Sequence, residues 1–126
     1  MQVFRRNDGI IEVAFDASDP LDLARAQHAS MQVAALYQAH GRAPLLVDLT
    51  EVRESSLDTA QLEPPRKALR MAIVVGSFLV QAAGESFMEA MDGDGIERRI
   101  FRSRLAAEGW LAEALSQGAV AGGAQA

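Results

Sequence analysis

The chain has 126 residues, no cysteine and a net charge of −5, and its length predicts one domain at residues 1–116 with a flexible tail at 117–126. The lack of cysteine excludes disulfides and thiolate chemistry, and the acidic balance disfavours nucleic-acid binding, which needs a basic face. No apolar run approaches the ~20 residues of a membrane-spanning helix and no signal peptide precedes the domain, so we expect a cytoplasmic protein that is not integral to a membrane.

The N-terminal residues predict a β-hairpin. Two stretches, Val3–Arg6 and Ile10–Phe15, flank the turn Asn7–Gly9. The Asp-Gly pair within this turn tolerates positive φ. The two stretches should therefore pair as antiparallel strands.

A long helix should follow the hairpin. Asp19 is expected as its N-cap, with Pro20 at the first helical position and the acidic Asp22 in the first turn. The helix should run to about His40, where Gly41 can adopt the left-handed conformation that ends a helix. The face expected to lie on the sheet comprises Ala26, Ala29, Val33, Leu36, Tyr37 and His40.

The middle of the chain predicts two buried strands with a short helix between them. The strands are Leu45–Leu49 and Met71–Val75, whose continuous apolar runs are typical of strands covered on both faces. Ser55 and Asp58 fit a capping box at the start of the short helix, which must end before Pro64.

The last part of the chain predicts a helix, a strand and a second helix. Gly76 and Ser77 form a tight turn with Ser77 as the helix N-cap, Glu97–Phe101 is the strand, and Ser103 caps the last helix. The expected inner faces are Leu79, Ala83, Phe87 and Ala90 on the first helix and Ala107, Trp110, Leu111 and Ala114 on the last. This order of elements predicts an α/β fold with a mixed, largely parallel five-stranded sheet covered by helices.

Three stretches of the sequence resemble the SpoIIAA-like family of bacterial proteins, which belongs to the STAS class. They read LLVDLTEV, MAIVVG and IFRSRLAAEGWLAEA, and with their spacing they cover roughly residues 3–115. The resemblance implies a STAS-like fold and a non-enzymatic regulatory or protein-interaction module. The family is also compared with CRAL-TRIO domains, which implies, as an alternative, a carrier for a small molecule or lipid.

The same resemblance implies a phosphorylation or interaction loop at Glu54, Ser55 and Ser56. In anti-sigma-factor antagonists of this class, a strand ending in Asp-Leu is followed by an acidic-Ser-Ser-Gly motif, whose serine is phosphorylated by a partner kinase. Here Asp48-Leu49 precedes a similar Glu-Ser-Ser stretch, but Leu57 stands at the glycine position. The serines also fit the capping box described above, so both interpretations stay open.

No set of residues fits a catalytic, metal or cofactor site. His28 and His40 would lie about 18 Å apart along one helix, too far to share a metal. Asp92 and Asp94 resemble the start of a calcium loop, but Ile96 stands at a ligand position. We therefore predict no enzyme activity and no cofactor.

Two surface features remain as candidate binding sites. Open α/β sheets bind ligands beyond the carboxyl ends of their strands, which predicts a ligand or partner rim at Thr50, Gly76, Ser77 and Phe78, although Phe78 also fits local packing. A basic cluster before the last two strands fits either an acidic partner or a solvated rim; it consists of Arg66, Lys67, Arg70, Arg98 and Arg99. We expect a protein partner, and the exposed sheet edges are also compatible with a homodimer.

Overall fold

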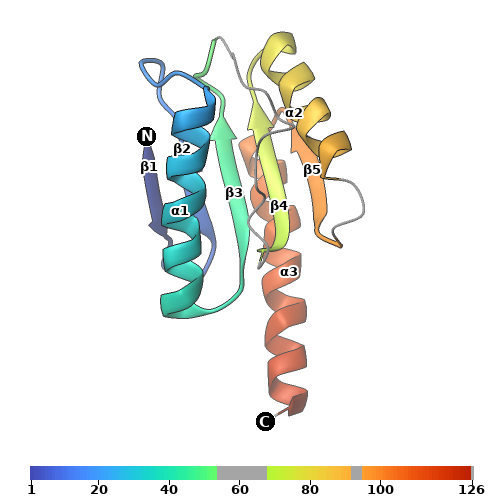
Figure 1. Ribbon diagram of the computed structural model, residues 1–126. Coiled ribbons are helices and arrows are strands. Elements are labelled where there is room, and N and C mark those ends of the chain that lie inside the picture. Colours follow the sequence, from blue (N-terminus) through green and yellow to red (C-terminus); the bar gives the residue numbers. More distant parts are fainter. Residues whose placement is uncertain (54–67, 92–94, 126) are drawn as a thin grey trace.

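The computed structural model describes residues 1–53, 68–91 and 95–125. They form one five-stranded sheet, in the order β1-β2-β3-β4-β5, with helices on both of its faces (Figure 1). The strands are β1 (Gln2–Arg5), β2 (Ile11–Ala14), β3 (Ala43–Leu49), β4 (Ala68–Val75) and β5 (Glu97–Phe101). The helices are α1 (Leu23–His40), α2 (Phe78–Ala90) and α3 (Arg104–Gln125). The short helix predicted from Ser55 lies outside the described residues.

The connectivity decides which helix covers which face of the sheet. β1 pairs with β2 in antiparallel fashion, whereas β2, β3, β4 and β5 are parallel to one another. Crossovers between parallel neighbours are right-handed, so α1 and α2 lie on the same face (Figure 1). α1 packs on β1 and β2, α2 packs on β4 and β5, and α3 packs on β3 and β4. The predicted α/β class with a mixed, largely parallel sheet is confirmed.

The predicted hairpin is confirmed, with β1 shifted by one residue towards the N-terminus and β2 shorter by one residue at each end. Gly9 has a φ of 96°, as the turn requires. The Asp8 carboxylate also accepts a hydrogen bond from the Ile10 amide at 3.1 Å, which fixes the turn locally.

The start of α1 differs from the prediction, whereas its end agrees. The N-cap is Asp22, whose carboxylate accepts the Arg25 amide at 2.8 Å. Asp19 does not cap the helix, because its carboxylate is buried and accepts the Asp16 amide at 3.0 Å instead. At the other end, Gly41 has a φ of 88° and donates to the carbonyl oxygen of Tyr37 at 2.8 Å.

The inner face of α1 is largely as predicted. Ala29, Val33 and Tyr37 are buried, and Ala26 and Leu36 are half-buried. His40 is exposed, so its predicted place against the sheet is wrong. It occupies the last helical position, where the chain turns out through the exposed Gly41 before β3 begins.

Serine caps both of the later helices, as predicted. Ser77 Oγ accepts the Val80 amide at 3.2 Å, and Ser103 Oγ accepts the Ala106 amide at 3.2 Å. On α2, Phe87 is buried and Ala83 is half-buried, as predicted, and Val80 is buried as well, whereas the side chains of Leu79 and Ala90 lie outside the described part of the chain. The predicted inner face of α3 is confirmed, since all of its members are buried: Ala107, Trp110, Leu111 and Ala114. α3 continues to Gln125, through the residues for which we expected a tail.

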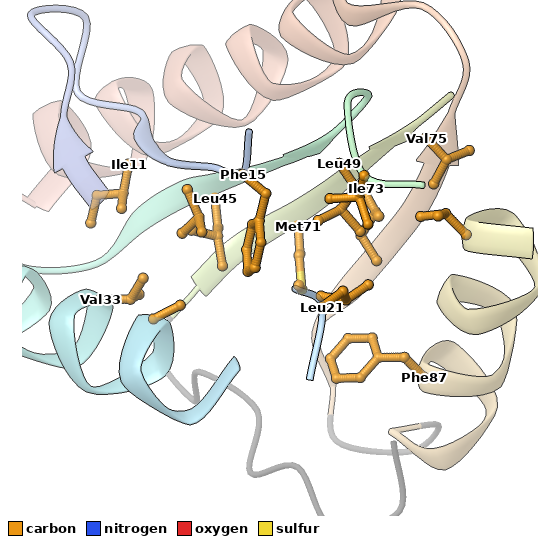
Figure 2. Packing of buried hydrophobic residues seen from close by; sticks show 14 of the residues in the cluster. Ile11, Phe15, Leu21, Val33, Leu45, Leu49, Met71, Ile73, Val75 and Phe87 are labelled. Atoms are coloured by element: carbon orange, nitrogen blue, oxygen red, sulfur yellow. The ribbon is translucent and has the colours of Figure 1, made fainter. Parts of the chain in front are cut away.

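The sheet separates two apolar cores. The larger core lies beneath α1 and α2 and includes Phe15, Val33, Met71 and Phe87 (Figure 2). The smaller core lies beneath α3 and centres on Trp110. Alternate residues of each central strand serve the two cores, as the two-residue period of a strand requires.

Candidate functional site

An apolar cavity lies between α1 and α2, above the middle of the sheet. Its volume is about 100 Å³. Phe15, which follows β2, Met71 on β4 and Phe87 on α2 project towards this region (Figure 2). The described lining residues are Val13, Phe15, Leu21, Ala26, Ala29, Ser30, Val33, Leu45, Val47, Leu49, Met71, Ile73, Ala83, Gly84 and Phe87.

The cavity exists because small residues occupy the inner faces of both helices. α1 contributes Ala26, Ala29 and Ser30 to the lining, and α2 contributes Ala83 and Gly84. α1 packs on β1 and β2 and α2 packs on β4 and β5, so β3 lies between the strands that the two helices cover. The helical periods predicted several of these small residues on inner faces but not the cavity, since the cavity depends on how the two helices are placed on the sheet.

The predicted rim at the carboxyl ends of β3 and β4 is brought together in part. Thr50, Gly76 and Ser77 line one shallow, open depression together with Glu51 and Arg53. A side chain at Gly76 would collide with the carbonyl oxygen of Thr50, so glycine is required for this close approach. The side chain of Phe78 lies outside the described part of the chain.

The hydroxyl groups of this rim already have local partners. Thr50 donates its amide to Asp48 Oδ1 at 2.9 Å, and its Oγ1 binds the same carboxylate oxygen. Ser77 Oγ is occupied as the cap of α2. The described rim therefore offers a surface for contact rather than an activated nucleophile.

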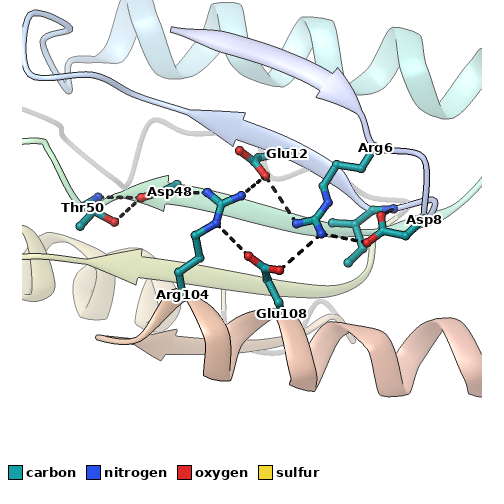
Figure 3. A network of polar contacts seen from close by, with 8 residues as sticks. Arg6, Asp8, Glu12, Asp48, Thr50, Arg104 and Glu108 are labelled. Carbon is teal, nitrogen blue, oxygen red and sulfur yellow. Dashed lines mark hydrogen bonds and ion pairs between the residues drawn. The ribbon is translucent and has the colours of Figure 1, made fainter.

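A charged network that was not predicted lies on the face of the sheet that α3 covers, opposite to the cavity (Figure 3). Arg104 at the start of α3 donates to Glu12 Oε1 at 2.5 Å, to Asp48 Oδ2 at 2.7 Å and to Glu108 Oε1 at 2.8 Å. Arg6 adds a second guanidinium, 3.6 Å from Glu12 and 3.4 Å from Glu108. Glu12 is only 5% exposed, so its charge depends on these partners.

The electrostatics of this network stabilise its charged state. Hydrogen bonding to Glu12 raises the pKa of the Arg104 guanidinium, although partial burial opposes this shift. Burial by itself would raise the pKa of Asp48, but hydrogen bonds from Thr50 and Arg104 outweigh it and lower that pKa. Since its acids are paired with arginines, the network is suited to holding β2, β3 and α3 together rather than to proton transfer.

The described members of the predicted basic cluster are held by neighbouring side chains. β4 and β5 are parallel neighbours, and Arg70 lies 3.6 Å from Glu97 and 3.2 Å from Glu113. Arg70 and Arg99 both stack on Trp110, with distances to the ring centroid of 4.9 and 5.2 Å. Arg98 lies over the Phe87 ring at 5.4 Å. Arg66 and Lys67 lie outside the described residues, as do Glu54, Ser55 and Ser56 of the predicted phosphorylation loop.

The described residues contain no group of three or more histidines and acids placed to hold a metal ion. His28 instead contacts the Gln32 amide on the same helix, at 2.5 Å. Among the described helices, none combines the length and apolar character needed to cross a membrane.

No family model, curated protein or solved structure matches this chain. The resemblance to the SpoIIAA-like family therefore stays a prediction, and function must be argued from the sites themselves.

Proposed function

We propose that this protein is a non-enzymatic binding domain that holds a small apolar molecule in the cavity between α1 and α2. Of the two functions that the sequence suggests, the geometry favours this carrier function over docking of a protein partner. The observation that carries the proposal is the lining, which is apolar except for one serine side chain among the described residues. We also propose that the sheet and helices belong to a STAS-like fold and that the protein is cytoplasmic.

The size and chemistry of the cavity support a ligand of about one aromatic ring. Water gains little in such a space, because it finds too few polar partners. An engineered apolar cavity of about 150 Å³ binds benzene or xenon, and the cavity here, at about 100 Å³, is of the same order. A six-carbon ligand with a Kd of about 1 mM would gain roughly 0.7 kcal/mol per heavy atom, well within the known ceiling.

The test uses the methionine methyl groups as reporters of binding. Met71 lines the cavity, whereas Met31 is 72% exposed on the outer face of α1. Titration of ¹³C-methyl-labelled protein with benzene should shift the Met71 signal in a saturable way and leave the Met31 signal unchanged. The Met71 signal is assigned with Met71→Leu.

Cavity-filling variants provide the specificity control. Ala26→Leu on α1 and Ala83→Leu on α2 each extend a lining residue into the space and should weaken benzene binding at least tenfold. Ala35→Leu adds the same group to the exposed face of α1 and should leave binding unchanged. A folded wild type whose Met71 signal does not respond would refute the proposal, and so would a response that both filled variants retain.

We propose a protein-docking surface at the rim as a second candidate function. The supporting observation is that Thr50, Gly76 and Ser77 share one open depression with the exposed charges Glu51 and Arg53. Phosphorylation at Ser55 or Ser56 would add negative charge to the chain a few residues beyond it. This function remains compatible with ligand binding, because the depression and the cavity have no described lining residue in common.

The docking proposal is tested with charge reversals. A partner purified with the wild type from its own host should be lost from Arg53→Glu and retained by Arg5→Glu, which reverses an exposed charge on the edge strand β1. Intact-mass analysis of the same preparation would show an increment of about 80 Da for one phosphate group. Equal recovery by both variants would contradict docking at the rim.

A further inference from the structure

We infer that the ligand of the cavity is an amphiphile with a single hydrogen-bonding group, and that the Ser30 hydroxyl binds this group. The inference rests on the proposed apolar-ligand function and specifies which class of molecule the cavity selects. It follows from what Ser30 contributes to the lining and from what its hydroxyl does in the structure.

Ser30 supplies the only hydroxyl group among the described lining side chains. The other described members are aliphatic, aromatic or glycine, apart from the weakly polar thioether of Met71. The backbone around Ser30 is in the middle of α1, where amides and carbonyls are used by the helix itself. The cavity therefore presents one polar group against an otherwise apolar wall.

The hydroxyl of Ser30 is available to a ligand. A serine within a helix commonly bonds back to the carbonyl four residues earlier, but across the described residues no hydrogen bond to Ser30 Oγ is formed. Ser30 is half-buried, so part of the residue is removed from solvent. A ligand hydroxyl placed here would satisfy a group that otherwise loses part of its hydration.

This arrangement predicts discrimination between matched ligands. Phenol has the same ring as benzene with one hydroxyl added, and it is uncharged at pH 7. A neutral hydrogen bond in a partly dry site should make Ser30→Ala bind phenol about 2- to 12-fold more weakly than the wild type. Benzene affinity should be unchanged in the same variant, because benzene makes no such bond.

The experiment measures the Kd of phenol and benzene by the Met71 methyl shift in the wild type, Ser30→Ala and Ser30→Thr. Ser30→Thr retains a hydroxyl and should preserve the preference for phenol. Ser86→Ala removes an exposed serine hydroxyl from α2 and should change neither affinity. Alanine is favourable within a helix, so Ser30→Ala is expected to fold.

The outcomes separate the two proposals. If both ligands bind the wild type and Ser30→Ala weakens neither or weakens both equally, the role of Ser30 is refuted while the apolar-ligand function survives. If neither ligand moves Met71 in the folded wild type, the proposed function fails and the inference fails with it. Phenol binding that weakens about 2- to 12-fold in Ser30→Ala, with benzene binding unchanged and the preference for phenol retained in Ser30→Thr, is the expected result.

Discussion

Replacing Arg104 with leucine should destabilise the protein, because it leaves a buried carboxylate with one distant partner. Glu12 is 5% exposed, and Arg104 lies 2.5 Å from it whereas Arg6 lies 3.6 Å away. Breaking a fully buried ion pair costs about 3–5 kcal/mol, and an exposed pair is worth about 0.2–1 kcal/mol. The Arg104 side chain is 41% exposed, so we expect an intermediate loss of about 2 kcal/mol. For a domain of this size that loss lowers Tm by roughly 6–10 °C.

Urea unfolding followed by circular dichroism and by Trp110 fluorescence measures this loss. The matched control is Arg102→Leu, which removes an exposed arginine that donates to Gln81. The double variant Glu12→Leu/Arg104→Leu should recover at least half of the lost stability, because it removes the buried charge together with its partner. The reasoning is refuted if Arg104→Leu costs no more than the control, or if the double variant loses the sum of the single losses.

Three further predictions concern the rim and the titrating groups. Gly76→Ala should lower the free energy of unfolding by at least about 1 kcal/mol, because the new methyl group collides with the Thr50 carbonyl oxygen. Gly109→Ala, whose methyl group would meet nothing within 4 Å on α3, should raise it by roughly 0.5–1 kcal/mol. Equal effects of the two variants in thermal unfolding would contradict this prediction. The pKa of Asp48 in the folded protein is lower than its ordinary value of 3.8. The ionised Asp48 therefore stabilises the fold above pH 3.8, and this stabilisation is lost as the pH falls through the lower pKa of the folded state. Asp48→Asn should accordingly make the free energy of unfolding, measured by urea unfolding, depend less on pH in the acid range. Burial raises the pKa of Tyr37, the only tyrosine, so absorbance at 295 nm should show phenolate only as alkaline unfolding removes the helical signal; titration near pH 10 with the fold intact would disprove it.

Much of the fold could be predicted from the sequence where the cause was local. The hairpin turn at Gly9, the caps at Ser77 and Ser103 and the end of α1 at Gly41 depend on residues within a few positions of one another. Backbone φ preferences and side-chain caps act over that range. The inner face of α3 followed equally well from its helical period.

The misplaced start of α1 shows where local reasoning fails. Aspartate is favoured as an N-cap and proline at the first helical position, so the types of Asp19, Pro20 and Asp22 all favour a helix start. Between them Leu21 is 6% exposed and belongs to the larger core, and Asp19 is itself buried. Tertiary burial therefore decided between two acceptable caps, and it selected Asp22.

The sequence by itself determined the class of the fold and the position of most elements, because caps, turns and hydrophobic periods are short-range properties. Only the tertiary structure decided the two sites. Arg104 and Glu12 are separated by 92 residues along the chain, and their ion pair forms because the fold brings the start of α3 within reach of Glu12 on β2. The cavity likewise requires Ala29 on α1 and Ala83 on α2 to line the same space on one face of the sheet. Such spacing depends on the packing of whole elements, which no local pattern encodes.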